Sequence, residues 1–132
     1  MNSTTMHKDG DNMAAAYTLQ INRGEDLYKT FQWLQGDGET PVNLRGYSGQ
    51  CQIRNGAFNQ GLITEINVEI IEAEQGRFAL KLSAEQTKKI PITGYDFSEL
   101  ETYAYDVYFF APNGTSYRTL NGQAKISPGV TR

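Results

Sequence analysis

The chain has 132 residues, which is enough for one domain with its own core. Its formal net charge of −3 argues against nucleic acid as a partner, because nucleic-acid-binding domains usually carry a basic face. No apolar run approaches the roughly 20 residues of a membrane helix, and the first residues lack the apolar stretch of a secretory signal. We therefore expect neither nucleic acid nor a membrane as a partner.

The N-terminal segment is polar and could not bury a face by itself. We predict an extended arm over residues 1–15 and a single β-sandwich domain over residues 16–132. An arm of this kind becomes ordered when it binds a neighbouring subunit. His7, Lys8 and Asp9 are therefore candidate contact residues.

Thirteen glycines and eight tyrosines are typical of a β protein with many turns. Alternation of apolar and polar side chains predicts seven strands. These strands are expected at residues 17–22, 27–34, 47–54, 65–70, 77–82, 103–110 and 116–126. Ser83 and Gln86 fit a capping box, which predicts one short helix near residues 83–90 that Pro91 ends. We expect an all-β fold, an antiparallel immunoglobulin-like β-sandwich of about seven strands with this single helix.

The last two strands are predicted to form a hairpin at the centre of the sheet. Asn113-Gly114 between them favours a type I′ turn, which needs a positive φ at both central residues. A glycine at position 122 inside the final strand indicates a bulge or a close backbone approach.

Strand alternation divides the aromatic side chains of this hairpin between two faces. If Tyr105, Val107 and Phe109 face the core, Tyr108 and Phe110 must face outward. Outward aromatic side chains can bury in a protein interface or stack on sugars, and they can also form ordinary cross-strand pairs. Together with Tyr117 across the turn, the two outward rings are candidate contact residues.

The sequence offers no constellation for catalysis, for a metal or for a cofactor. The single histidine, His7, lies in the predicted arm, far in sequence from Cys51, which we expect to be a small core residue. One cysteine and one histidine cannot hold zinc. The acidic stretches at residues 9–12 and 37–39 do not match a calcium loop, so we interpret them as solvated turns. No glycine-rich phosphate loop is present, and we expect no enzyme.

Two groups of acidic residues deserve a separate interpretation. They are Asp96, Glu99, Glu101 and Asp106, and Glu65, Glu69, Glu72 and Glu74. Outward positions on strands explain both groups without catalysis, because charged side chains discourage edge-to-edge aggregation. A hydrolase that uses Asp106 and Glu99 is the weakest of the functions considered.

Six short segments stand out by their order and spacing. They are Phe31-Gln32-Trp33, Pro41-Val42-Asn43-Leu44-Arg45-Gly46-Tyr47, Gln52-Ile53-Arg54, Leu82-Ser83-Ala84-Glu85-Gln86-Thr87, Tyr105-Asp106-Val107 and Ile126-Ser127-Pro128-Gly129-Val130-Thr131-Arg132. Together they resemble a group of small tailed-bacteriophage virion proteins related to the N-terminal domain of the phage baseplate upper protein. That group commonly has Asp-Leu-Thr-Gly-Tyr where this chain has residues 43–47, and the loop at residues 92–102 is longer here.

The resemblance implies a β-sandwich module that assembles in many copies on a virion and has no catalytic residues. We therefore expect a bacteriophage structural protein of the tail, baseplate, neck or head surface, made in the host cytoplasm and located in the virion. Its expected partners are other virion proteins and copies of itself, as a homo-oligomer. The alternative is a carbohydrate-binding module that uses Tyr108, Phe110 and Tyr117 as a stacking platform.

Overall fold

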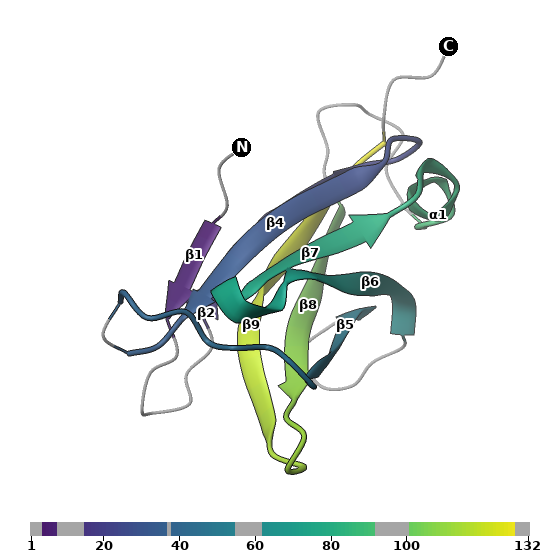
Figure 1. Cartoon of the computed structure of the whole chain (residues 1–132). Helices are drawn as coiled ribbons and strands as arrows, with labels where there is room; N and C mark the ends of the chain where they lie inside the picture. Colours follow the sequence, from purple (N-terminus) through teal and green to yellow (C-terminus); the bar gives the residue numbers. More distant parts are fainter. Residues whose placement is uncertain (1–3, 8–14, 37, 55–61, 92–100, 129–132) are drawn as a thin grey trace.

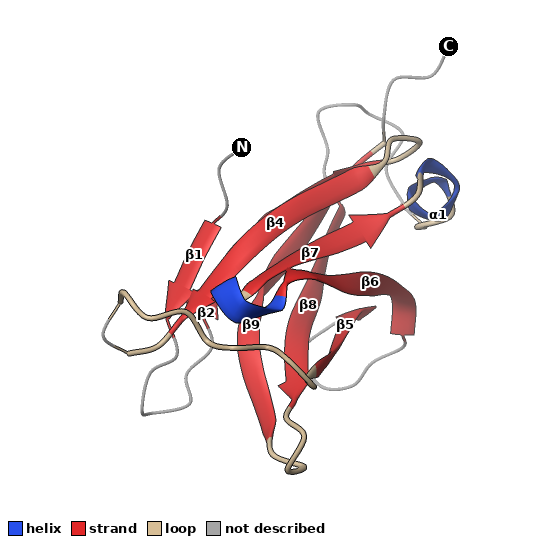
Figure 2. Ribbon diagram, viewed as in Figure 1, coloured by secondary structure: helices blue, strands red, loops and turns tan. Residues whose placement is uncertain are grey.

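The computed structural model of the protein describes residues 4–7, 15–36, 38–54, 62–91 and 101–128 (Figure 1). Its elements are β1 (Thr4–His7), β2 (Ala15–Ala16), β3 (Leu19–Asn22), β4 (Leu27–Leu34), β5 (Ser48–Arg54), β6 (Leu62–Glu72), the 3₁₀ turn η1 (Ala73–Gln75), β7 (Arg77–Leu82), α1 (Ala84–Lys88), β8 (Glu101–Phe110) and β9 (Ser116–Ser127). The all-β prediction is confirmed (Figure 2), and each of the seven expected strands is present. The described part of the chain also contains β1 and β2, which alternation did not indicate.

The strands form one curled sheet in the order β1-β4-β7-β6-β5-β8-β9-β2, and β3 also pairs with β9. Strand β6 joins its two halves, because Leu62 to Ile66 pair with β5 while Asn67 to Glu72 pair with β7. We call β1, β4, β7 and the end of β6 the first half-sheet. The second half-sheet consists of the start of β6, β5, β8, β9, β2 and β3. The two halves curl toward each other, with β4 and β7 in front of β8 and β9 in Figure 1.

The sheet is mixed, so the prediction of a wholly antiparallel fold is wrong, and the immunoglobulin-like arrangement is not confirmed. Among the described strands, three pairings are parallel: β1 with β4, β2 with β9, and β3 with β9. Alternation shows which side chains share a face but not which strand lies beside them. The close approach expected at Gly122 is confirmed, since the Tyr17 N–H donates to the Asn121 carbonyl at 3.0 Å and a Cβ on Gly122 would collide with the Tyr17 carbonyl oxygen.

Aromatic side chains join the two half-sheets in the core. Phe78 of the first half-sheet meets Phe109 of the second edge to face, with ring centroids 4.9 Å apart. Phe31 stacks on Phe78 at 5.4 Å, and Trp33 stacks on Phe109 at 5.7 Å. All four side chains are almost fully buried, so this ring cluster contributes to the apolar burial that stabilises the fold.

Helix α1 forms where the capping box predicted it. The Ser83 hydroxyl accepts from the Gln86 N–H at 3.2 Å, and the Gln86 side-chain oxygen accepts from the Ser83 N–H at 2.9 Å. Thr87 on this helix is buried and donates its hydroxyl to the Glu25 carbonyl at 2.8 Å. The helix is thereby fixed against the turn between β3 and β4.

The turn between β8 and β9 closes the hairpin but is not the expected type I′ turn. The Gly114 N–H donates to the Ala111 carbonyl at 2.9 Å, so Pro112 and Asn113 are the central residues. Proline fixes φ near about −65°, which excludes the positive φ that type I′ requires at its first central residue. Gly114 takes the left-handed conformation at φ 92°, and a three-residue loop results.

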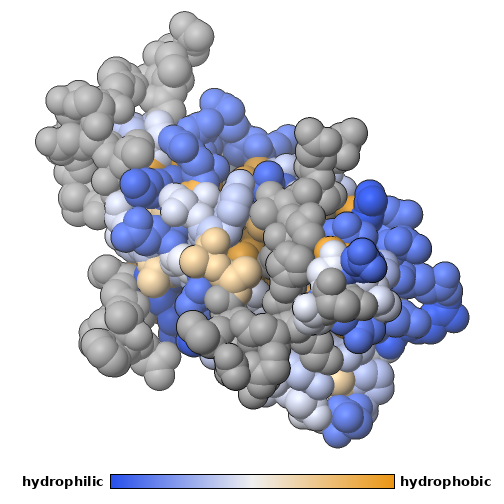
Figure 3. Space-filling view, turned by 90° about the vertical axis from the view of Figure 1, so that its left-hand side faces the viewer, coloured by the Kyte–Doolittle hydropathy of each residue, from blue (hydrophilic) through white to orange (hydrophobic). Residues whose placement is uncertain are grey.

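The predicted division into an arm and a domain stays a prediction. Thr4–His7 form an edge strand, with Thr4 in register with Phe31 and His7 with Leu34. Seen from the β1 side, the described surface is mostly hydrophilic, and hydrophobic side chains gather only in small areas (Figure 3).

Candidate functional site

Strand β8 lies between β5 and β9 and presents two aromatic rings on the outer face of the second half-sheet. The rings of Tyr108 and Phe110 stack with centroids 6.5 Å apart and planes at 16°. Phe110 keeps 37% of its surface exposed, and Tyr108 is half-buried. Their cross-strand neighbours are polar, since Gln50 and Arg118 flank Tyr108 while serines flank Phe110. The outward orientation predicted for these rings is confirmed.

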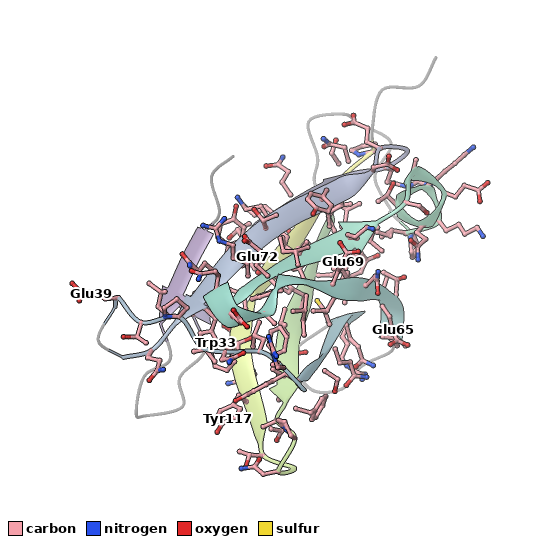
Figure 4. The ribbon with its side chains drawn as sticks, viewed as in Figure 1. Trp33, Glu39, Glu65, Glu69, Glu72 and Tyr117 are labelled. Carbon is pink, nitrogen blue, oxygen red and sulfur yellow. The ribbon has the colours of Figure 1, made fainter. Side chains whose placement is uncertain are left out.

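The hairpin loop keeps Tyr117 away from this pair. Its three residues put Tyr117 opposite Phe109, the core ring, where a two-residue loop would have put it opposite Phe110. Tyr117 accordingly meets the core indole of Trp33, with centroids 5.8 Å apart (Figure 4). The structure therefore does not bring Tyr108, Phe110 and Tyr117 together as one stacking platform.

A bulge at Thr119 restores the register of the rest of β9. Val107 pairs with Leu120 and Tyr108 pairs with Arg118, so Thr119 has no cross-strand partner in the ladder. Its hydroxyl donates to the Val107 carbonyl at 3.3 Å. Because of the bulge, Leu120, Ala124 and Ile126 face the core. Arg118 precedes the bulge and lies on the outer face beside Tyr108.

Three charged side chains continue this outer face beyond the rings. Asp106 lies on β8 near Arg54 of β5 and Arg118 of β9, and both arginines lower its pKa. Burial has the larger effect, so the net pKa of Asp106 is raised. The Arg54 guanidinium donates to the Gln52 side chain. We call the surface made by Arg54, Asp106, Tyr108, Phe110 and Arg118 the Tyr108 face.

The candidate residues of the N-terminal segment are only partly placed. His7 ends β1, beside Leu34 of β4. Lys8 and Asp9 lie outside the described residues, as do Asp96 and Glu99 of the hydrolase hypothesis.

Cys51 is a core residue, as predicted. It is 1% exposed, and burial raises the pKa of its thiol, with a smaller contribution from Asp106. A thiol held in its protonated form is a poor nucleophile. In the described ranges no group of three or more histidine, cysteine or acidic residues could hold a metal ion. Nor does any helix in that part of the chain have the length and apolarity to cross a membrane.

A second outward surface was missed by the sequence reasoning. Tyr28 of β4, Lys81 of β7 and Asn67 of β6 form one cross-strand row on the outer face of the first half-sheet. Tyr28 is 49% exposed and borders a cavity of about 360 Å³. Together with Glu69, which pairs with Lys81, these residues make up what we call the Tyr28 face. The signal was available, because alternation along β4 places Tyr28 out of phase with Phe31 and Trp33.

Comparison with known proteins gives a likeness in fold. No protein-family model and no curated protein sequence matches the chain. Among solved structures, the fold is similar to that of the N-terminal domain of phage TP901-1 ORF48, with a TM-score of 0.52 and 8% sequence identity. The match covers 96% of this chain and 99% of that one. The protein therefore shares its fold with a domain of a phage protein.

Proposed function

We propose that the protein is a non-enzymatic structural protein of a bacteriophage virion, located at the tail, baseplate, neck or head surface. Two independent lines support this proposal. The ordered segments resemble small virion proteins related to the N-terminal domain of the baseplate upper protein. The fold is similar to that of a phage protein domain over almost the whole chain.

The Tyr108 face is the proposed contact surface, and the stacked pair on it is the observation that carries the assembly proposal. Two bulky rings lie side by side on the outer face of β8, and their direct partners in the adjacent strands are polar. Aromatic and arginine side chains are enriched where protein interfaces bury their centres. The proposed partners are copies of this chain and other virion proteins, with the N-terminal segment as a second contact element.

Charges on this face suit a symmetric contact between copies. Arg54 and Arg118 flank Asp106, and the described residues place no lysine or arginine nitrogen within ion-pair distance of that carboxylate. A two-fold contact brings the same patch of both copies together, so each arginine can meet the partner's acid or rings. Burial between copies would also remove the exposed aromatic surface from water.

Location in the virion is tested by mass spectrometry and immunogold labelling of purified particles of the phage that encodes the chain. We expect the protein to be present in the particles in many copies and labelled at one structural position. Absence from purified particles would falsify the proposal.

Self-association is tested by native mass spectrometry of the full chain and of the double variant Tyr108→Ala/Phe110→Ala. The wild-type chain is expected to form oligomers and the double variant to remain monomeric, because the aromatic pair is lost. Tyr28→Ala removes an exposed ring from the other half-sheet, so it serves as the matched control and is expected to oligomerise normally. A wild-type chain that is monomeric at every concentration would argue against contacts between copies.

A further inference from the structure

We propose that the cavity on the Tyr28 face binds a neutral saccharide unit. This site is distinct from the Tyr108 face, because it lies on the outer side of the opposite half-sheet. The inference does not depend on the proposed virion role, since it rests only on the shape and chemistry of this cavity.

The cavity has the size of a small-ligand site and a floor carried by paired strands. Its volume is about 360 Å³, at the lower end of the range of about 300–1,000 Å³ in which small-molecule sites fall. The floor is the row of Tyr28, Lys81 and Asn67 across three paired strands. The start of α1, with Ser83 and Gln86, forms its wall. Strand pairing fixes the spacing of the backbone positions that carry these side chains.

The exposed ring of Tyr28 supplies an apolar platform. Within the described part of the chain, the ring makes no aromatic contact and its hydroxyl makes no hydrogen bond. A tyrosine ring is apolar on its face and polar at its tip. A sugar ring has the matching chemistry, with C–H groups on one face and hydroxyl groups around the rim.

Polar groups around the ring offer both donors and acceptors. The Asn67 side-chain amide has no hydrogen-bond partner among the described residues and can donate and accept. Asp26 accepts from the Ala84 N–H through Oδ1 at 2.7 Å, which leaves its second carboxylate oxygen available. Hydroxyl groups, which also both donate and accept, match this combination.

The charge of the cavity favours a neutral ligand over an anion. Lys81 Nζ lies 3.5 Å from Glu69 Oε2, so its charge is already matched. Asp26 adds a second negative charge at the rim. A phosphate or sulfate would meet the Asp26 carboxylate while the lysine of the lining is already paired, whereas an uncharged polyol would not be repelled.

The proposal is tested by titrating the full-length, ¹⁵N-labelled chain with glucose, galactose and N-acetylglucosamine while the amide signals are followed by NMR. Glycerol and inorganic phosphate are the control probes, because the first lacks a ring face and the second is anionic. At least one sugar is expected to cause saturable shifts at the amides of residues 28, 67 and 81, and neither control probe is expected to do so.

Matched variants assign the binding to this cavity. Tyr28→Ala is expected to raise the dissociation constant of the sugar by about tenfold or more, and tenfold corresponds to ~1.4 kcal/mol of binding free energy. Tyr28→Phe is expected to retain the stacking contribution. Asn67→Ala is expected to weaken binding, while Tyr108→Ala, on the opposite face, is expected to bind as the wild type does. The proposal is overturned if no sugar shifts these amides, if phosphate shifts them more strongly, or if Tyr28→Ala binds like the wild type.

Discussion

The Tyr28 face and the Tyr108 face are built by the same alternation on two halves of one sheet, yet their chemistry differs. On the Tyr28 face, Lys81 and Glu69 form an exposed ion pair and the single ring stands beside a cavity. On the Tyr108 face, two rings stack and Asp106 is flanked by arginines beyond ion-pair distance. A flat pair of rings suits another protein surface, and a ring above a hollow suits a small molecule.

The largest expected difference in the free energy of unfolding is between a substitution on the inner side of β8 and one on the Tyr108 face. Phe109 is fully buried against Trp33 and Phe78, so Phe109→Ala is expected to lower the free energy of unfolding by about 3–5 kcal/mol. The adjacent Phe110 lies on the outer face, and Phe110→Ala is expected to change the stability of the monomer by less than about 1 kcal/mol. Urea unfolding of both variants measures the difference, and equal losses would show that the outer ring is part of the core.

An intermediate effect is expected at the loop that orients the Tyr108 face. Gly114 has φ 92° and open space around its Cα, so Gly114→Ala adds backbone strain without a collision. We expect a loss of about 1–2 kcal/mol in the free energy of unfolding. Ser116→Ala, at an exposed position two residues later, is the control and should change it by less than about 0.5 kcal/mol. An unchanged stability of Gly114→Ala would mean that the loop can adopt another turn.

The smallest effect is a pH dependence that the Tyr108 face acquires from Asp106. Burial raises the pKa of this carboxyl in the folded chain, so folding favours its protonated form. Its stabilising contribution is complete below the ordinary pKa of 3.8 and is lost as the pH rises through the higher folded pKa. Asp106→Asn should therefore be more stable than the wild type at pH 7, by less than about 1 kcal/mol, and equally stable in acid.

Thermal unfolding of the monomeric chain at several pH values provides the measurement for Asp106. If the asparagine variant is less stable than the wild type at pH 7, the attraction of Arg54 and Arg118 outweighs burial, and the Tyr108 face is then electrostatically satisfied without a partner.

Most of the fold's local features could be predicted from the sequence. The strands, the capped helix and the inward set of Tyr105, Val107 and Phe109 depend on periodicities that a strand or helix imposes on its own residues. The position of Tyr117 could not be obtained in this way, because it depends on the length of the hairpin loop. Pro112 was the overlooked signal, since it fits only a turn in which it has a negative φ.

The candidate site was predictable in part for the same reason. Alternation along one strand was sufficient to turn Tyr108 and Phe110 outward. The flanking charges were not predictable, because the three-residue hairpin loop places Arg118 beside Tyr108 and strand order places Arg54 near Asp106. The cavity beside Tyr28 could not be predicted, because it forms where three strands and a helix pack together. No local pattern in the sequence shows that these elements are neighbours.

By itself, the sequence determined an all-β fold, the approximate positions of seven strands, the helix cap and the two outward rings of β8, because all of these follow from local spacing and turn chemistry. Only the tertiary structure decided that β1 pairs in parallel with β4 and β3 in parallel with β9. It also decided the course of β6 through both half-sheets and the separation of Tyr117 from the Tyr108 face. These features depend on contacts between residues far apart in the chain, where packing of the aromatic core and a one-residue change of register select the partner.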